Sequence, residues 1–518
     1  MKYQNPIIRG FHPDPSICRV GSDFYLVTST FTYFPGIPLY HSKDLVHWDL
    51  VGHCLTRESQ IYLEACKNSK GIYAPTIRWH QGRFYVITTE VTGKGNFIVH
   101  SEHPEGPWSE PVLIDQNGID PSLFWDDDGS CWYCGKGRLD GKRGIVAFQV
   151  NPLTGELLSE RYLISRGCGG KCAEGPHIYK KDGWYYLVTA EGGTQYSHRV
   201  VIQRSKCITG GYEPCPHNPL LSHMEKNWKV IQAVGHGDLV EDTKGNWWCV
   251  CLGIRMFGDI LLHNLGRETF LAPVTWKDGW PQVEEASLSM EMEGELPKTG
   301  EMVYSENEGC WSFLYSENEE AFPEELSYIK GKHSENYRIK DGKLFLYGTE
   351  TGLDSEMGSP SCILREQQEF KTEAVACLNL SESRCSRFGM TVYYSNYNHY
   401  DVAAVQRDGG WSLSLYKHIY DVGYESQSKH VEDAVERIWM KIQSDKTEYR
   451  FFYSTDGEAW NILGSGTIAA MCTETMMERS YTGTMIGLFS EQGAGVFEQE
   501  FTINSTWDGA DLVGGIVK

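Results

Sequence analysis

The chain has 518 residues, which is too long for one hydrophobic core and predicts two to four domains. Its formal charge of −22 argues against nucleic acids and anionic membrane surfaces as partners, because both are themselves negative. The 16 Trp, 29 Tyr and 54 Gly favour strands joined by tight turns, so we expect an acidic, β-rich globular protein.

The N-terminal stretch MKYQNPIIRGFHPDP lacks the apolar core of a signal peptide, and no run of about 18 apolar residues occurs in the chain. We therefore expect a cytoplasmic protein whose 16 cysteines are thiols rather than a disulfide framework. Cys131 and Cys134 of CWYC have the spacing of a redox or zinc pair. In a strand they would face opposite sides, and no second pair completes a zinc site, so we predict no metal there.

Five segments of the first half share one pattern: a small or turn-forming start, a short strand, a Gly, Asp or Asn turn, and an aromatic-rich strand. They are DPSICRVGSDFYLVTS from Asp14, APTIRWHQGRFYVITT from Ala74, DPSLFWDDDGSCWYCG from Asp120, GPHIYKKDGWYYLVTA from Gly175 and HGDLVEDTKGNWWCVC from His236. Each segment predicts a β-hairpin. Five such units, at intervals of 46 to 61 residues, predict a five-bladed β-propeller.

The hairpin repeat ends near residue 290, and the acidic stretch 291–310 is a candidate linker. Beyond it, strand-like runs such as GKLFLYG, RFGMTVYYS and YRFFYSTDGEAWNIL alternate with turns. This pattern favours a β-sandwich of two packed antiparallel sheets. The predicted all-β chain is thus a propeller over 1–290, a linker over 291–310 and a sandwich over 311–518.

Ionisable residues stand at the starts of four of the hairpins. If the first strand of each blade lines the axis, Asp14, Asp120 and His236 gather at one end of the channel, and Glu174 joins them from one position earlier. Clustered carboxylates raise one another's pKa, so a protonated and an ionised acid can coexist at one pH. Hydrolysis of a glycosidic bond needs such a pair. The alternative is that Asp14 and Asp120 only cap turns before strands.

The segments that carry these acids resemble glycoside hydrolase family 43, in its β-xylosidase/α-L-arabinofuranosidase type. The resemblance lies in NPIIRGFHPDPSICRVGSDFYLVTSTFTYFPGIPLYHSKDLVHW, GIDPSLFWDDDG, AEGPHIYKKDGWYYLVTAEGGT, GHGDLVEDTKGNWW and LGRETFLAPVTWKDGWP, in the family's order and spacing. It implies a five-bladed propeller that hydrolyses with inversion. Many members carry a C-terminal concanavalin-like β-sandwich, or jelly roll, which the second half of this chain resembles.

The resemblance implies a role for each of the three acids. Asp14 of HPDPS matches the general base that deprotonates the attacking water, and Glu174 of AEGPH matches the general acid that protonates the leaving oxygen. Asp120 of GIDPS matches the acid that tunes and orients the glutamic acid. In an inverting enzyme the base and acid carboxyls stand about 6.5 to 9.5 Å apart, because a water must fit between them and the sugar.

Positions that contact the substrate also follow from the resemblance; they are Phe31, Tyr73, Thr194, His236 and Arg267. Arg267 of LGRET matches an arginine that reaches the terminal sugar, and a blade-closing salt bridge is the alternative. Arg255 of GIR is a further candidate. His236 matches an axial histidine that takes part in a water-linked calcium site in some relatives, and a structural role explains it equally well. No cofactor is therefore required, and a calcium ion near the propeller axis remains an open alternative.

One departure from the family affects the substrate. Many β-xylosidases of the family read GIWAPD where this chain reads GIYAPTIRW, so Tyr73 and Thr76 should alter the floor of the pocket. Arabinofuranose and xylopyranose present similar hydroxyl patterns, and the sequence does not rank them.

The predicted function is that of an inverting exo-glycoside hydrolase, which releases terminal β-D-xylose and/or α-L-arabinofuranose from hemicellulose-derived oligosaccharides. Its expected partner is a small oligosaccharide substrate, and the number of subunits is open, a homo-oligomer included. One alternative is an endo-arabinanase-like or fructan-cleaving propeller hydrolase, whose open groove should lack the pocket-forming segment FTYFPGIPLYHS. The other is a non-catalytic sugar-binding protein, which should have lost at least one of the three acids.

Overall fold

The computed structural model describes residues 2–226, 228–257, 262–287, 289–291, 309–316, 322–476 and 480–507. Its regular structure is almost entirely β-strand. The helices of the described residues are three single-turn 3-10 segments, η1 (Ser334–Asn336), η2 (Ile468–Met471) and η3 (Thr473–Thr475). None of the helices in these ranges has the length and apolar character needed to cross a membrane. The prediction of an all-β chain is confirmed.

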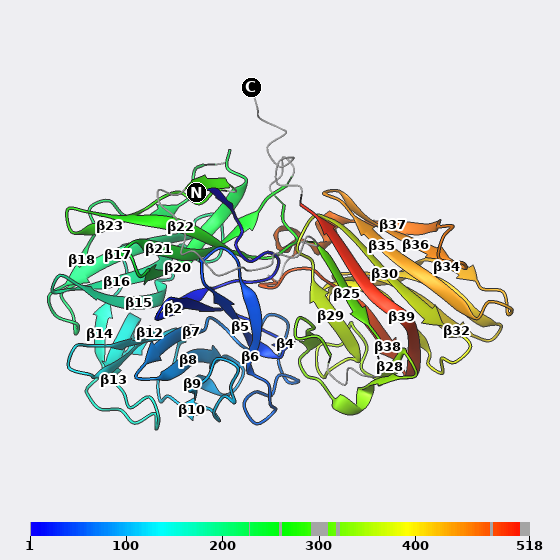
Figure 1. Cartoon of the computed structure of the whole chain (residues 1–518), viewed down its shortest axis with the longest axis horizontal. Coiled ribbons are helices and arrows are strands. Elements are labelled where there is room, and N and C mark those ends of the chain that lie inside the picture. The colour runs from blue at the N-terminus through cyan, green and yellow to red at the C-terminus, as the bar shows by residue number, and fades with distance from the viewer. Residues whose placement is uncertain are drawn as a thin grey trace.

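Among the described residues, the first half forms five antiparallel sheets of four or five strands, drawn from blue to green in Figure 1. In chain order they contain β2 (Ser16–Val20), β3 (Asp23–Val27), β5 (Gly36–Ser42) and β6 (Asp49–Leu55); β7 (Thr76–His80), β8 (Arg83–Glu90), β9 (Gly95–Ser101) and β10 (Val112–Leu113); β11 (Ile119–Trp125), β12 (Cys131–Leu139), β13 (Lys142–Gln149) and β14 (Tyr162–Ser165); β15 (Glu174–Lys181), β16 (Trp184–Glu191), β17 (Arg199–Ser205), β18 (Glu213–Pro214) and β19 (Leu221–Ser222); and β20 (Ile231–Glu241), β21 (Trp247–Arg255), β22 (Glu268–Lys277) and β23 (Trp280–Val283). Each sequence repeat supplies the first two strands of one sheet, paired as a hairpin.

The first strands of the five sheets surround a common axis. β2 contacts β7, β7 contacts β11, β11 contacts β15, β15 contacts β20, and β20 returns to β2. A closed ring of antiparallel sheets is a β-propeller. The first and last strands of this half of the chain also pair, because β1 (Lys2–Gln4) is antiparallel to β24 (Ser289–Glu291). Nearby, Asn5 Nδ2 donates to the carbonyl of Leu271 at 3.0 Å.

A buried ion pair links the first strands across the ring. Arg78 on β7 donates to both carboxylate oxygens of Asp238 on β20, at 2.8 and 3.2 Å. It also donates to Ser16 Oγ on β2 at 3.2 Å and lies 3.0 Å from His177 Nδ1 on β15. Burial alone would raise the pKa of Asp238, but the Arg78 guanidinium outweighs it and holds that pKa well below its usual range. Asp238 is therefore a buried anion that needs its partner.

We expect Arg78→Met to lower the free energy of unfolding by about 3 to 5 kcal/mol, because it leaves the buried Asp238 carboxylate unpaired. The matched control is Arg83→Met in the same blade, which removes a surface pair with Glu102 (2.8 Å). That control should change stability by less than about 1 kcal/mol. Urea unfolding measures both variants, and equal stabilities would contradict the structural role given to Arg78.

The second half forms two packed sheets. The first has the order β27-β28-β39-β30-β35-β36-β37 with β25 also paired to β39, and the second has the order β29-β38-β31-β32-β33-β34. The strands of the first sheet are β25 (Cys310–Leu314), β27 (Tyr337–Lys340), β28 (Lys343–Gly348), β30 (Lys371–Asn379), β35 (Arg437–Ser444), β36 (Glu448–Ser454), β37 (Asn461–Thr467) and β39 (Gly493–Thr506). The strands of the second sheet are β29 (Cys362–Glu366), β31 (Arg387–Ser395), β32 (Asn398–Arg407), β33 (Gly410–Ile419), β34 (Val422–His430) and β38 (Met485–Glu491). This is the predicted sandwich. The domain boundaries remain predictions, and residues 292–308 of the expected linker lie outside the described residues.

The sandwich packs directly against the propeller (Figure 1). β4 (Tyr33–Phe34) of the propeller pairs with β26 (Tyr328–Ile329) of the second half. Arg255 is fully buried, and it donates to Glu268 in its own blade and to Glu369 of the sandwich, both at 2.7 Å. Its guanidinium is therefore committed to the domain interface. The suggestion that Arg255 contacts substrate is wrong for this reason.

Candidate active site

Four residues at equivalent places in four blades share an unusual backbone conformation. Asp14, Asp120, Gly175 and His236 all have a positive φ, of 54°, 55°, 54° and 49°. In the last three blades the register of the first two strands also shifts here, as in a β-bulge. A bulge re-aims a side chain, and left-handed backbone in a non-glycine residue costs roughly 1 to 3 kcal/mol. Three of these bends are strained, and they aim the side chains of Asp14, Asp120 and His236 at the same end of the ring.

The glycine explains why the acid of the fourth blade lies one residue early. A Cβ on Gly175 would lie 3.0 Å from two atoms of the His236 ring, so a side chain there would clash. The positive φ of Gly175 also suits glycine better than any other residue. The carboxyl of this blade therefore comes from Glu174, at the first position of β15.

Asp14 is buried and surrounded by donors. Ser29 Oγ donates to its Oδ2 at 2.7 Å, and Arg267 donates to its Oδ1 at 3.0 Å. His236 Nδ1 lies 3.5 Å from the same Oδ1. Burial would raise the pKa of Asp14, but Arg267, His236 and the Ser29 hydroxyl together outweigh it and lower the pKa below its ordinary value. Asp14 is therefore held as a carboxylate that is able to accept a proton.

Asp120 has the opposite character. It is buried, and burial together with the nearby carboxylates of Glu174 and Asp14 raises the pKa of Asp120 to about 7, against the lowering effect of His236. The mutual electrostatic effects of these groups place the three predicted acids within one site. The site thus contains one carboxylate that is kept ionised and one that keeps a proton near neutral pH.

The raised pKa of Asp120 predicts how catalysis depends on pH. Below about pH 7 Asp120 retains the proton, and above it the site loses that proton and gains a charge beside Glu174. We therefore expect kcat/KM to fall as the pH rises through about 7, since a general acid mechanism needs the proton. Asp120→Asn should move this basic limb to lower pH, because an amide holds neither the proton nor the charge. A pH profile whose basic limb is identical in Asp120→Asn would contradict the assignment.

Glu174 has a partner that the sequence reasoning missed. Lys136 Nζ donates to Glu174 Oε2 at 2.5 Å, from β12. Burial would lower the pKa of Lys136, but the carboxylates of Glu174 and Asp120 outweigh it and raise that pKa. Lys136 pairs in register with Ile119, which precedes Asp120. Aligning the two strands of the third hairpin could have revealed it, because cross-strand neighbours lie side by side.

Aromatic residues from both domains enclose the site. The Phe31 ring centroid lies 5.2 Å from that of Tyr73 and 5.7 Å from that of Tyr481, and the Arg267 guanidinium carbon lies 5.5 Å from the Phe31 centroid. Arg267 also donates to the carbonyl of Tyr481 at 3.1 Å. Tyr481 belongs to the sandwich. No repeat in the sequence pointed to it, because it reaches the site only through docking of the second domain.

A cavity of about 730 Å³ adjoins Arg267 on the side of the sandwich. Thr194 lines it from the propeller, and Ser480, Tyr481 and Thr482 line it from the second domain. The structure therefore places Phe31, Tyr73, Arg267 and Thr194 around one region. His236 contacts the carboxylate of Asp14. Whether these side chains touch a sugar stays a prediction.

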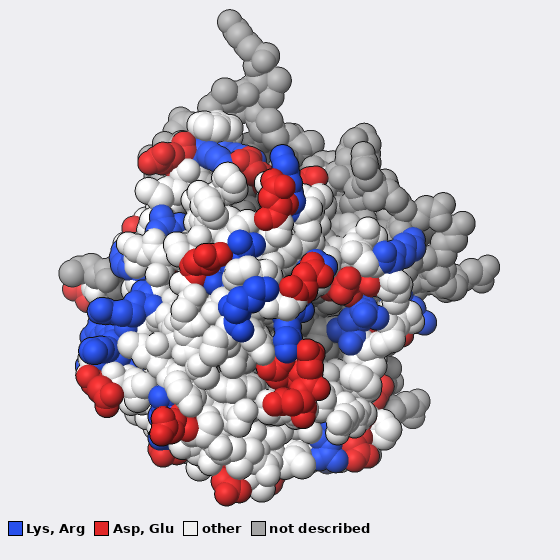
Figure 2. All heavy atoms as spheres, turned by 90° about the vertical axis from the view of Figure 1, so that its left-hand side faces the viewer, with Lys and Arg blue, Asp and Glu red and all other residues white. Residues whose placement is uncertain are grey.

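Within the described ranges, no group of three or more His, Cys, Asp or Glu residues is arranged to hold a metal ion. Cys131 and Cys134 are both buried, and Cys134 Sγ lies 3.7 Å from the carbonyl of Pro176. On the outer face of the propeller in Figure 2, Lys and Arg side chains are interspersed with Asp and Glu.

Comparisons with known proteins agree with this geometry. Residues 3–281 match the family described as "Glycosyl hydrolases family 43", and residues 318–498 match "Beta xylosidase C-terminal Concanavalin A-like domain". The chain is 39% identical to a non-reducing end alpha-L-arabinofuranosidase of Bacteroides ovatus, over 94% of this chain and 91% of that protein. It is 40% identical to a xylosidase/arabinosidase of Butyrivibrio fibrisolvens, over 78% and 80% of the two chains. The solved Bacteroides ovatus Xyloglucan PUL GH43B superposes with a TM-score of 0.89 at 37% identity, covering 98% of this chain and all of that one.

Proposed function

Because the chain belongs to glycosyl hydrolase family 43, we propose that it is an inverting exo-glycosidase that removes terminal α-L-arabinofuranose or β-D-xylose from short oligosaccharides. The observation that carries this proposal is the contrast between two buried acids of one site. Asp14 is held ionised by Arg267, His236 and Ser29, and Asp120 holds a proton near neutral pH. Cleavage of a glycosidic bond requires an ionised base and a protonated acid at once. Asp14 supplies the first, and the electrostatic effect of Glu174 on Asp120 supports a proton that the two acids share.

The proposed reaction is a single displacement. A water attacks the anomeric carbon while Asp14 takes its proton, and the bond from that carbon to the leaving oxygen breaks as Glu174 donates a proton to the oxygen. The hydrogen bonds from Ser29 and Arg267 support the role of Asp14, because they fix its carboxylate before the water arrives. Asp120 lies next to Glu174 and keeps a proton in the pair. The separation of about 6.5 to 9.5 Å between the two reacting carboxyls stays a prediction.

Exo action is supported by the enclosure of the site. Tyr481 of the sandwich stands against Phe31 and Arg267, and Ser69 Oγ of the propeller lies 3.3 Å from Ser480 Oγ. The backbone N–H of Tyr481 donates to Ser69 Oγ at 2.8 Å, which fixes this loop on the propeller. An open groove for a long chain would need this side to be free. The enclosure favours a terminal sugar over the endo-acting alternative.

The choice between arabinose and xylose rests on the second blade. Tyr73 packs against Phe31, whereas Thr76 Oγ1 donates to the carbonyl of Pro121 at 2.9 Å and is used within the fold. We propose that both pentoses are accepted, since relatives named for one activity and for both are similar to this chain over most of its length.

The test is a comparison of initial rates on the nitrophenyl α-L-arabinofuranoside and β-D-xyloside, with the α-D-glucoside as a control. We expect turnover of at least one pentoside and none of the glucoside. Negligible rates on both pentosides would overturn the proposed function.

We also propose that catalysis needs no cofactor and no calcium ion. In support, the carboxylate of Asp238 near the axis already accepts from Arg78, Ser16 and Tyr179, which leaves it less available to a calcium ion. His236 Nδ1 faces Asp14 instead of an open position.

A further inference from the structure

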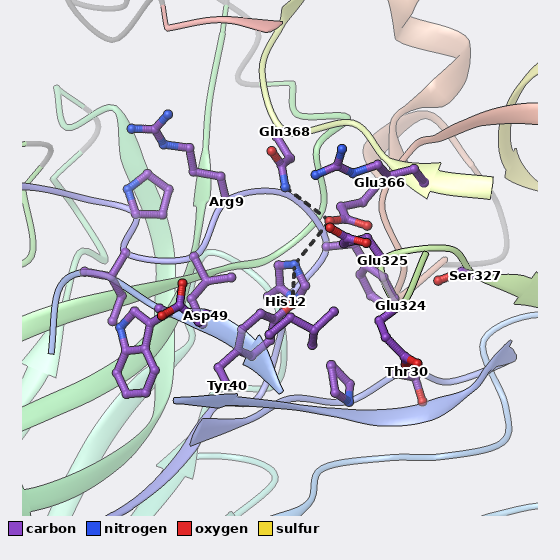
Figure 3. A pocket seen from close by; sticks show the side chains of 18 of the residues that line it. Arg9, His12, Thr30, Tyr40, Asp49, Glu324, Glu325, Ser327, Glu366 and Gln368 are labelled. Carbon is purple, nitrogen blue, oxygen red and sulfur yellow. Dashed lines mark hydrogen bonds and ion pairs between the residues drawn. The ribbon is translucent and has the colours of Figure 1, made fainter. Parts of the chain in front are cut away.

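A second cavity, of about 790 Å³, lies between the propeller and the sandwich. Neither cavity is lined by any of the three acids, but the first one includes Arg267 and this one does not. The propeller contributes residues from Tyr3 to His12 and from Tyr40 to His53, and the sandwich contributes Arg365 and Glu366 of β29 together with Gln368. Figure 3 shows side chains from both domains pointing into this space. The volume lies within the roughly 300 to 1,000 Å³ that is usual for small-molecule sites.

One contact across the domain boundary and one hydrogen bond within each domain order one wall of the cavity (Figure 3). The ring of His12 lies 3.6 Å from Glu366 Oε1, and Tyr40 Oη lies 3.4 Å from His12 Nε2. Gln368 Nε2 donates to Glu366 Oε1 at 3.2 Å. These polar groups are held in place before any ligand arrives, which lowers the entropic cost of ordering side chains when a ligand binds.

Arg365 is the feature that points to a ligand. Its Nε is buried and has no hydrogen-bond partner among the described residues. The guanidinium lies over the Trp311 ring at 4.7 Å, a contact that leaves its N–H groups without an acceptor in that direction. A buried donor without an acceptor costs about 1 to 3 kcal/mol. An oxygen atom of a bound molecule would remove that cost.

The charges around the cavity define the class of ligand. The carboxyl groups of Asp49, Glu324, Glu325 and Glu366 line it, against the guanidinium groups of Arg9 and Arg365. Arg9 is already paired with Glu369 at 3.2 Å. An excess of carboxylates disfavours an anion. In the described part of the chain no set of ligands suits a metal ion.

A neutral molecule with many hydroxyl groups satisfies these requirements. Hydroxyl groups can donate to the carboxylates and accept from Arg365, and the Trp48 and Tyr40 rings offer apolar faces to C–H groups. We propose that this cavity is a second binding site for a neutral saccharide, a pentose or a short oligosaccharide, separate from the catalytic site. The choice of pentose among saccharides rests on the proposed function, whereas the site itself does not.

The cavity also borders the catalytic base. Ser29 lines the cavity, and its hydroxyl donates to Asp14. A saccharide bound here would therefore lie next to Ser29, which donates to the carboxylate of Asp14.

The test uses the full chain with Glu174→Gln, which blocks hydrolysis, and with 5-fluorotryptophan in place of tryptophan. The fluorine signal of Trp48 is assigned by its loss in Trp48→Phe. Trp79 is the matched control, because it is exposed on β7 and does not line the cavity. Titration with D-xylose, L-arabinose and xylotriose should shift the Trp48 signal and leave that of Trp79 in place.

Arg365→Met should weaken the response of Trp48 to sugar about tenfold or more, because a hydrogen bond to a charged group is lost. Glu325→Gln is the second variant if Arg365→Met fails to fold, and it should weaken the response in the same direction. The proposal would be overturned if the Trp48 signal did not shift with any of the three sugars, or if it shifted equally in the variants and in the protein with Arg365 and Glu325 intact. A response to inorganic phosphate or Mg²⁺ in place of sugar would overturn the ligand class. The result is independent of turnover, so inactivity on nitrophenyl pentosides would refute the proposed function and leave this test standing.

Discussion

Asp14→Asn will lower kcat/KM on both nitrophenyl pentosides by about 10⁴-fold, at the upper end of what a general base contributes. Arg267, His236 and Ser29 lower the pKa of Asp14 and hold its side chain as a carboxylate. An amide of the same shape cannot accept the proton of the attacking water. The amide keeps the shape of the side chain and can still accept from Ser29 and Arg267 through its oxygen, so we expect the variant to retain its β-rich circular dichroism spectrum. Steady-state kinetics and thermal unfolding measure both properties.

The matched control for this result is Asp23→Asn in the same hairpin. Asp23 pairs with His41 at 2.7 Å on β3 and has no contact with the site among the described residues. Its loss should leave kcat/KM within about twofold, as expected for a partly exposed pair. A folded Asp14→Asn protein with the activity of Asp23→Asn would refute the assignment of the base.

Glu174→Gln will show a loss of activity that depends on the leaving group. A natural disaccharide needs a proton on its leaving oxygen, so its turnover should fall by about 10³ to 10⁴-fold. A dinitrophenyl glycoside has a leaving group that departs without a proton, so its bond-breaking step should be far less affected. Kinetics on the two substrates, at one pH, give the comparison.

For this variant the control is Glu213→Gln, which removes an exposed carboxylate paired with Arg204 at 2.9 Å in the same blade. It should leave both substrates unaffected. If Glu174→Gln reduced turnover of the disaccharide and of the dinitrophenyl glycoside by the same factor, Glu174 would not be the proton donor.

Much of the architecture could be predicted from the sequence because it is encoded locally. Each hairpin of the propeller carries its own turn and its own aromatic strand, so five short segments reveal five sheets. The acids could be found in the same way, since Asp14 and Asp120 occupy equal places in their repeats. The sequence also showed that Glu174 stands one residue earlier in its repeat than the other acids do. The structure gives the cause, because the His236 ring lies so close to Gly175 that a Cβ at residue 175 would have little room.

The residues that sequence reasoning missed depend on contacts between distant segments. Lys136 reaches Glu174 through the register of a second strand, and Tyr481 reaches Arg267 only because the sandwich docks on the propeller. Arg255 shows the opposite error. The motif GIR suggested a substrate contact within the family resemblance, but burial against Glu268 and Glu369 makes Arg255 part of the interface. Long-range packing of this kind leaves no periodic signal in the chain.

The central claim is that Asp14 and Glu174 act on opposite faces of the sugar ring in a single displacement. Proton NMR during the first minutes of hydrolysis of a β-D-xyloside tests it most directly, because the anomers of free xylose have separate signals before they equilibrate. We predict that α-D-xylose appears first and that the β-anomer grows later by mutarotation. Initial release of β-D-xylose would indicate a covalent intermediate and would contradict the roles given to both carboxyl groups.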